Sequence, residues 1–109
     1  MMQCHNRIFL YDEFVAEERR KYLVVVIYDI VDNRRRAAFA KYLKGFGVRV
    51  QKSAFECILP GSKYEKLIKG IPRLIGKEDQ IRVYKLTSNA DIRAWGTVDL
   101  VEEEEVVII

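Results

Sequence analysis

The residues of this chain best suited to chemistry are one acid and a group of arginines that follow an apolar run. Residues 22–30 read Tyr-Leu-Val-Val-Val-Ile-Tyr-Asp-Ile, which places Asp29 at the end of a predicted strand. Arg34, Arg35 and Arg36 follow a few residues later. A carboxylate beside basic side chains suits phosphodiester hydrolysis, because the acid can hold a metal ion while arginines hold phosphates. Asp29 could instead be a turn residue that binds nearby backbone amides.

Magnesium is the metal that an isolated acid of this kind would bind. Mg²⁺ prefers carboxylate oxygen and keeps several waters, so one or two protein carboxylates are enough when phosphate oxygens complete the shell. One chain offers a single acid at this position. A homodimer whose axis passes near the strand ends would bring Asp29 from each subunit to one ion.

Asp32 has a different expected role, since it stands where a helix N-cap is predicted. The three arginines then fall in the first helical turn, where positive charge opposes the helix dipole. This unfavourable placement indicates that they engage phosphates, together with Arg49 and Lys52 on the next strand. The alternative is that they pair with acids of the same chain, such as Asp12, Glu17 or the glutamates near the C-terminus.

Charge is unevenly distributed along a chain of 109 residues whose net charge is +3. Residues 31–52 contain seven Lys or Arg and one acid, a local balance of +6, and the region around residues 102–105 is acidic. A basic segment of this kind is typical of a surface that binds a polyanion. A solvated helix face would show the same composition.

Several other kinds of site have little support. His5 is the only histidine, which argues against nucleophilic mechanisms that use histidine as the base. Cys4 and Cys57 lie far apart without a CxxC partner, so neither a zinc site nor a disulfide framework is predicted. No apolar run approaches the roughly 18 residues of a membrane helix, and no secretory signal is recognisable. The expected location is therefore cytoplasmic.

The elements that must position the site follow the order β-α-β-β-α-β. Strands are predicted over residues 22–30, 48–52, 54–59 and 80–86, and helices over residues 32–46 and 62–76. Pro72 is expected to kink or divide the second helix. This is the ferredoxin-like α+β order, with a four-stranded antiparallel sheet and both helices on one face. Because residues 23–27 are apolar on both faces of their strand, we expect the bare sheet face to be buried in a homodimer.

Two segments complete the predicted organisation. Residues 1–21 form an N-terminal extension with a helix-compatible pattern at Leu10 and Phe14, and no function is assigned to them. The ferredoxin-like domain spans residues 22–109 and ends in a short predicted strand, residues 106–109, after a loop from Thr87 onward. That strand is expected at the edge of its own sheet or paired with the partner.

Two other functions on the same fold have weaker support in the sequence. Tyr28 and Phe55 suggest an RNA-recognition module, which stacks bases on aromatic side chains of its sheet. The Lys/Arg-Gly-Phe core of that module is absent, and an apolar first strand suits a covered sheet better. A small-molecule sensor has no supporting glycine-rich or ligand-specific motif.

The pattern of these residues resembles the CRISPR-associated protein 2 family. The resemblance rests on Tyr28-Asp29-Ile30, on Asp32 with its arginines, and on residues 47–55, Gly-Val-Arg-Val-Gln-Lys-Ser-Ala-Phe, and it extends over residues 22–86. It implies a ferredoxin-like homodimer of prokaryotic antiviral defence that partners the integrase of spacer acquisition. Some members are metal-dependent endonucleases. The family usually begins almost at the first strand, whereas here some 20 residues precede it.

The resemblance also implies roles for individual residues. Asp29 would be the metal-binding acid, one from each subunit. The basic positions would be Arg34, Arg35, Arg36 and Arg49, and the strand motif beside the site would include Ser53 and Phe55. Two functions follow: a magnesium-dependent endonuclease that cleaves RNA or DNA, or a non-catalytic adapter dimer that bridges the CRISPR integrase and binds duplex DNA.

Overall fold

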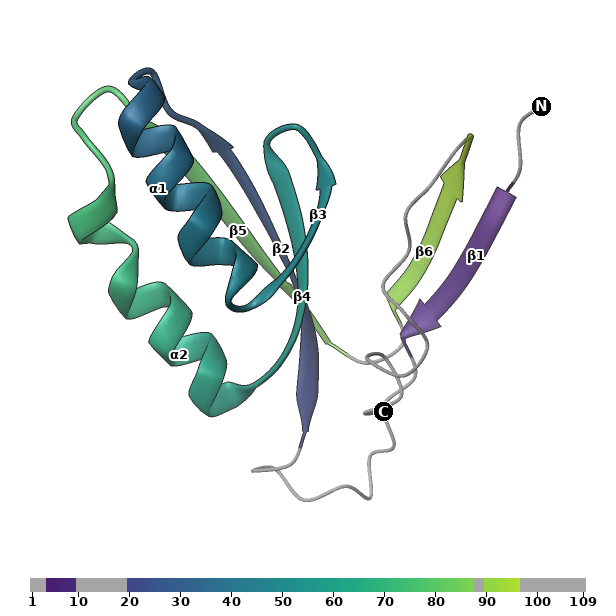
Figure 1. The fold of residues 1–109 in the computed structure, drawn as a ribbon. Coiled ribbons are helices and arrows are strands. Elements are labelled where there is room, and N and C mark those ends of the chain that lie inside the picture. The colour runs from purple at the N-terminus through teal and green to yellow at the C-terminus, as the bar shows by residue number, and fades with distance from the viewer. Residues whose placement is uncertain (1–3, 10–19, 88–89, 97–109) are drawn as a thin grey trace.

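A computed structural model describes residues 4–9, 20–87 and 90–96, and shows an α+β fold (Figure 1). The elements, in chain order, are β1 (Cys4–Phe9), β2 (Lys21–Asp29), α1 (Asn33–Lys44), β3 (Gly47–Gln51), β4 (Ala54–Pro60), α2 (Gly61–Gly70), a 3₁₀ turn (Pro72–Leu74), β5 (Gln80–Leu86) and β6 (Ala90–Trp95). The predicted β-α-β-β-α-β order is confirmed over β2 to β5. None of the helices within the described ranges is long and apolar enough to cross a membrane.

Four strands form the main sheet, in the order β3-β4-β2-β5, and every neighbouring pair is antiparallel. β2 lies in the interior of the sheet, between β4 and β5. Both helices cover the same face (Figure 1). This arrangement is the ferredoxin-like fold that the sequence predicts.

The core lies between this sheet and the helices. Val24, Val26 and Tyr28 of β2 are buried there, in one cluster with Phe39 and Leu43 of α1. Successive strand residues point to opposite faces, so the intervening residues of β2 point to the face without helices. On that face Val25 is half-buried and Ile27 is 43% exposed. The helix-free side of the strand is therefore covered only in part by the described chain, and the sequence predicts that a second copy covers that side.

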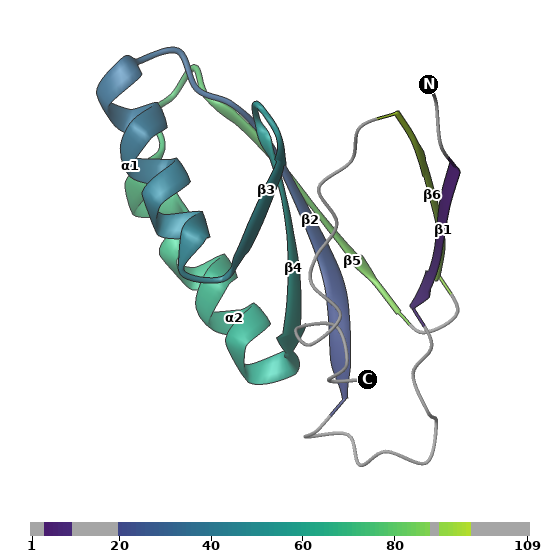
Figure 2. The same ribbon diagram turned by 45° about the vertical axis from the view of Figure 1, so that its right-hand side comes forward.

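A second, two-stranded sheet consists of β1 and β6, and it lies on the side of the main sheet away from the helices (Figure 2). Ile92 of β6 packs against Leu23, near the end of β2 where the strand begins, and Ile58 and Leu86 pack against the same residue. This ribbon was not predicted: residues 4–9 were expected in a helix-compatible extension and residues 90–95 in a loop. Its two strands are far apart in sequence, so no local pattern joins them.

The remaining sequence predictions fall into two groups. Leu10, Phe14 and the strand at residues 106–109 lie outside the described residues. The predicted division of the second helix is confirmed, since α2 ends at Gly70 and Pro72 begins the 3₁₀ turn. Proline has no N–H for an α-helical hydrogen bond, and the first position of a new turn tolerates it.

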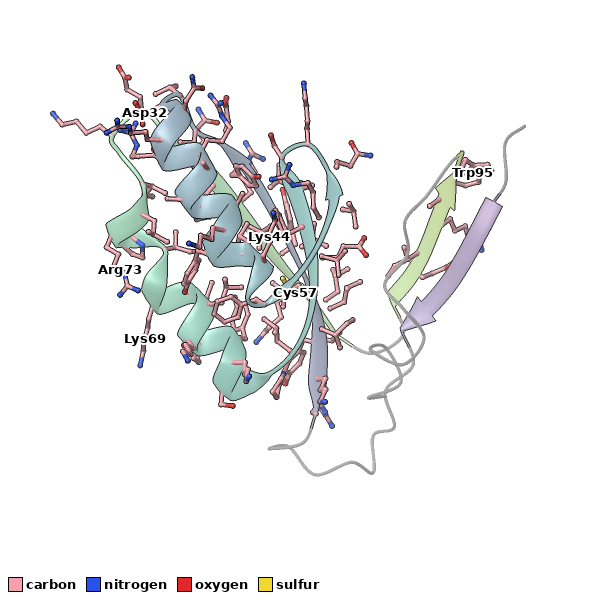
Figure 3. All side chains as sticks on the ribbon, viewed as in Figure 1. Asp32, Lys44, Cys57, Lys69, Arg73 and Trp95 are labelled. Carbon is pink, nitrogen blue, oxygen red and sulfur yellow. The ribbon has the colours of Figure 1, made fainter. Side chains whose placement is uncertain are left out.

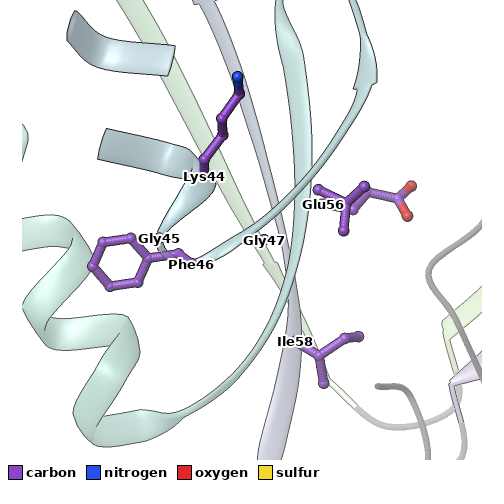
Figure 4. Close-up of a pocket in the computed structure, with 7 residues that line it drawn as sticks. Lys44, Gly45, Phe46, Gly47, Glu56 and Ile58 are labelled. Atoms are coloured by element: carbon purple, nitrogen blue, oxygen red, sulfur yellow. The ribbon is translucent and has the colours of Figure 1, made fainter. Parts of the chain in front are cut away.

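Gly47 is required where β3 enters the sheet. A Cβ at this position would lie 2.2 Å from the carbonyl oxygen of Glu56 and 2.6 Å from Sγ of Cys57. Figure 4 shows Gly47 crossing beside Glu56, at a hollow of about 300 Å³. Only a residue without a side chain permits this approach of the two strands.

We predict that Gly47→Ala destabilises the protein by about 1–3 kcal/mol, because the added methyl group forces β3 away from β4. Chemical denaturation measures this change. Gly61→Ala is the matched control, since a Cβ on Gly61 would have nothing within 4 Å, and it should leave stability unchanged or slightly higher. Equal stability of both variants would contradict the close contact at Gly47.

Candidate functional site

Asp29 is the last residue of β2, and this strand ends at one end of the main sheet (Figure 1). Asp29 stands opposite Gln80, the first residue of β5. The turn between β3 and β4 reaches the same end, where the Tyr28 amide donates to the Ser53 carbonyl at 3.0 Å. The Tyr28 hydroxyl lies 3.4 Å from the Lys52 carbonyl. Tyr28 and Ser53 thus hold this turn beside the acid.

The Asp29 side chain is exposed and available to a ligand. It follows Val25 and Ile27 at the two-residue spacing that places all three on the helix-free face. Its carboxylate has no hydrogen bond or ion pair with any residue that the structure describes. A turn acid bound to neighbouring amides, the alternative reading of the sequence, is not what the structure shows.

Asp32 has the structural role that the sequence predicts for it. Its Oδ2 accepts a hydrogen bond from the Arg35 amide at 2.9 Å, and its backbone is extended, with φ −94° and ψ 131°. This is the geometry of a helix N-cap, which satisfies one of the free amides at the start of α1.

The three arginines, predicted as one phosphate-binding group, differ in the structure. Arg35 donates through Nε to Oδ2 of Asp79 at 2.9 Å and through Nη2 to Oδ1 at 3.3 Å. Arg36 donates to the Ile30 carbonyl at 3.1 Å and to Oδ1 of Asn33 at 2.6 Å. Arg34 is exposed and has no such contact within the described chain.

For Arg35 the structure therefore shows pairing within the chain, the alternative left open by the sequence. The partner is Asp79, whereas Asp12 and Glu17 lie outside the described residues. Arg34 is the arginine most available to a phosphate.

Asp79 is the residue of this region that sequence reasoning missed. Besides Arg35, it accepts hydrogen bonds from the Gly76 amide at 2.6 Å and the Val31 amide at 3.1 Å. The hydrogen bond from Arg35, followed by that from Gly76, lowers the pKa of Asp79 from 3.8 to about 2. Its side chain is 0% exposed. An acid just before a predicted strand gives no local signal of these contacts.

The aromatic residues beside the site belong to the core. Phe55 is 0% exposed and Tyr28 is 3% exposed. The Tyr28 ring packs edge-on against Phe39, with centroids 5.1 Å apart. Neither ring is open to a nucleotide base, so the RNA-recognition alternative is excluded for this pair of aromatics.

The two other basic residues predicted to contact phosphate, Arg49 and Lys52, are both exposed. The guanidinium of Arg49 lies 5.6 Å from the centroid of Phe55, which orients an exposed side chain on the edge strand β3. Lys52 is exposed in the turn before β4. β4 separates Arg49 from β2, whereas Lys52 lies at the end of the sheet that carries Asp29.

One copy of this chain could supply only some of the ligands that a metal ion needs. Among the residues that the structure describes, no three His, Cys, Asp or Glu side chains are grouped for a metal. Asp32 and Asp79 are engaged in the contacts above, which leaves Asp29 as the available carboxylate at the end of β2. One exposed carboxylate fits a hard cation such as Mg²⁺ that retains waters and phosphate oxygens. It does not fit a metal that needs a complete protein shell.

Cys57 offers no alternative nucleophile at this face. Its side chain is buried, and burial raises the pKa of the thiol from 9.0 to about 12. The thiol therefore stays protonated at neutral pH and unreactive.

Comparison with known proteins places this arrangement in a family. Residues 22–94 match the family model for CRISPR associated protein Cas2. A Mycobacterium tuberculosis protein named CRISPR-associated endoribonuclease Cas2 is 49% identical over 87 residues, which are 80% of this chain and 77% of that protein. A Synechocystis protein named CRISPR-associated endoribonuclease Cas2 3 is 38% identical, over 81% of this chain and 99% of its own length.

A solved structure supports the same fold. A hypothetical protein from Thermus thermophilus superimposes with a TM-score of 0.65 and 37% sequence identity. The match covers 75% of this chain and 99% of that protein. The ferredoxin-like unit is therefore shared over nearly the whole length of that protein.

The contacts of Asp79 generate a pH-dependent prediction. Because its folded-state pKa is about 2, below the ordinary 3.8, its contribution to stability is present above about pH 4 and is lost as the pH falls toward 2. At neutral pH, Asp79→Asn should unfold at a lower denaturant concentration than the wild type. The difference between the two should shrink from pH 4 to pH 2.

A matched control is Asp91→Asn, which removes an ion pair with Arg93 whose side chains are both about half exposed. Exposed pairs contribute little, so this variant should unfold close to the wild type at every pH. A constant difference between Asp79→Asn and the wild type over the same range would contradict the role assigned to Asp79.

Proposed function

This chain belongs to the CRISPR-associated protein Cas2 family, and we propose that it is a magnesium-dependent endoribonuclease that works as a homodimer in the cytoplasm. The observation that carries the proposal is the exposed and unengaged carboxylate of Asp29 at the end of β2. Both relatives are named endoribonucleases, which favours RNA as the substrate.

The dimer is argued from the helix-free face of the sheet. Ile27 and Tyr84 are 43% and 45% exposed there, next to the half-buried Val25. Ile92 covers only the end of this face around Leu23. The apolar surface nearest Asp29 is therefore bare in the described chain, and a second copy packed on it would bury it.

The same packing would complete the site. A two-fold axis near the end of β2 would bring the two copies of Asp29 toward each other, which supplies the second carboxylate that one chain lacks. When bound between them, Mg²⁺ would activate a water and offset the negative charge of the scissile phosphate. Asp29 from each subunit would hold the ion.

Basic side chains would hold the RNA backbone beside these acids. Arg34 and Lys52 are both exposed on segments that adjoin the end of β2, and guanidinium and ammonium groups bind phosphate oxygens well. Arg35 and Arg36 would act mainly by shaping the start of α1, because their guanidinium groups already bind Asp79, Asn33 and a backbone carbonyl. Arg49 extends the basic surface along β3.

We predict that Asp29→Asn abolishes magnesium-dependent cleavage of labelled RNA, because a neutral amide is a poor ligand for a hard cation. Fold and RNA binding should persist, since the Asp29 side chain is exposed and forms no hydrogen bond or ion pair with a described residue. Asp91→Asn serves as the control, being the same change at an exposed acid on β6. Full cleavage by the Asp29 variant would rule out this mechanism.

A second function, that of a non-catalytic adapter for the CRISPR integrase, is favoured by the charge of the helical layer. We define this layer as α1, α2 and the 3₁₀ turn. It carries nine Lys or Arg and one acid, Glu65, in a chain of net charge +3. In Figure 3 Lys69 and Arg73 point away from the sheet, on the outer side of the helices. Such a surface would attract the backbone of duplex DNA.

The helical layer also provides a shallow hollow between its two helices. It measures about 400 Å³ and is lined partly by Lys66, Lys69 and Arg73. All three are exposed and form no ion pair with a described residue. Glu65 lines the same hollow but forms no ion pair with these cations, so a phosphate group would meet three unpaired cations and one acid there.

We predict that Lys66→Glu combined with Lys69→Glu weakens binding of duplex DNA strongly at low salt and reduces the salt dependence of binding. Each lost phosphate contact should lower the slope of log affinity against log salt by about 0.9. Lys66→Arg with Lys69→Arg keeps the charge and should bind like the wild type. Undiminished affinity of the charge-reversed protein, measured by fluorescence anisotropy, would refute a DNA surface on α2.

A further inference from the structure

We infer that Asp79 is a positioning residue for Asp29, whose carboxylate fixes the turn after β2 and so the direction in which the acid is presented. The inference rests on the proposed function, in which Asp29 meets the metal and the substrate. Asp79 touches neither, so it would act through the backbone that carries Asp29.

The contacts of Asp79 join three segments at one point. Its Oδ1 accepts from the amide of Val31, two residues after Asp29, and its Oδ2 accepts from the amide of Gly76 in the loop before β5. Both oxygens accept from the guanidinium of Arg35, in the first turn of α1. The carboxylate therefore ties the exit of β2 to α1 and to the entry of β5.

A second connection runs through the sheet. Asp79 directly precedes Gln80, which pairs with Asp29 in the ladder between β2 and β5. The backbone of Asp29 is thus held at two points. The hydrogen bond from Val31 to Asp79 fixes the chain after Asp29, and the pairing with Gln80 fixes Asp29 within the sheet. The Gly76 loop also packs closely on Arg35, since a Cβ on Gly76 would lie 2.9 Å from Nη2.

Asp79 cannot itself take the part of a metal ligand. An ionised carboxylate offers about four lone-pair sites, and the four hydrogen bonds above occupy them. Its side chain is also 0% exposed. Asp29 is the opposite case, because it is exposed and no described side chain holds it. The orientation of an acid without side-chain contacts depends on its backbone. Contacts that support a metal ligand in this way commonly change metal affinity or rate by about 10- to 100-fold.

The test compares wild type with Asp79→Asn in the full chain, without substrate, by NMR. The Asn side chain has one acceptor oxygen, and its NH₂ group would face N–H donors that now bind the second carboxylate oxygen. The hydrogen bonds at this position should therefore weaken, and the amide hydrogen of Val31 should exchange with solvent faster. We expect the ¹³C resonance of the Asp29 carboxyl group to move. Asp91→Asn should leave both signals unchanged, because its ion pair lies on β6.

Cleavage provides the second measurement, as the magnesium concentration that gives half the maximal rate. Asp79→Asn should raise this concentration by about 10- to 100-fold. A purely structural role would reduce the amount of folded enzyme and the maximal rate, but it would leave the half-maximal magnesium concentration where it is. This quantity therefore separates positioning from stability.

Arg35→Gln is the milder variant if Asp79→Asn yields no folded protein, since it removes two of the four donors and keeps the Val31 and Gly76 contacts. The Asp29 resonance should then move less, in the same direction. Wild-type Asp29 resonance and wild-type magnesium dependence in the folded variants would overturn the inference. Absence of magnesium-dependent cleavage in the wild type would instead overturn the proposed function, and the NMR comparison would still decide the role of Asp79.

Discussion

The alternation of side chains along β2 is the constraint on which the rest of this structure depends. Val24, Val26 and Tyr28 fill the core beneath the helices, so the two-residue period of the strand turns Asp29 toward the opposite face. A register shift of one residue would expose the Tyr28 ring and drive a carboxylate into an apolar core, which is strongly unfavourable. The packing that stabilises the fold therefore also places the acid.

The sequence allowed the local parts of this arrangement to be predicted, and the long-range parts were missed. β5 and the N-cap at Asp32 follow from hydrophobic periodicity and capping preference, which act over a few residues. The pair of Arg35 with Asp79 joins residues 44 positions apart, and β1 meets β6 across most of the chain. Neither contact has a local pattern. The arginines were consequently grouped as phosphate ligands, although Arg35 is engaged by the distant Asp79 and Arg36 by its near neighbours Ile30 and Asn33.

The two faces of the main sheet differ in chemistry, and this difference separates the two functions in space. The helical layer is basic and is packed on the sheet through Phe39 and Leu43, so its cations face outward. The helix-free face exposes the large apolar side chains of Ile27 and Tyr84, with Arg82 beside Ile27. Charge on one side suits a polyanion, whereas apolar surface on the other suits a protein partner.

A homodimer built on the helix-free faces would follow from this division, with consequences for both functions. The helical layers of the two copies would then lie on opposite outer sides, each open to a duplex, while the two copies of Asp29 met near the seam. Binding of DNA by the helices and hydrolysis of RNA by the acids would use different surfaces of one assembly. Because α1 begins only four residues after Asp29, its first turn is the place where these surfaces approach each other. Arg35 and Asp79 lock that turn, so the same ion pair that orders the start of the basic helix also supports the acid.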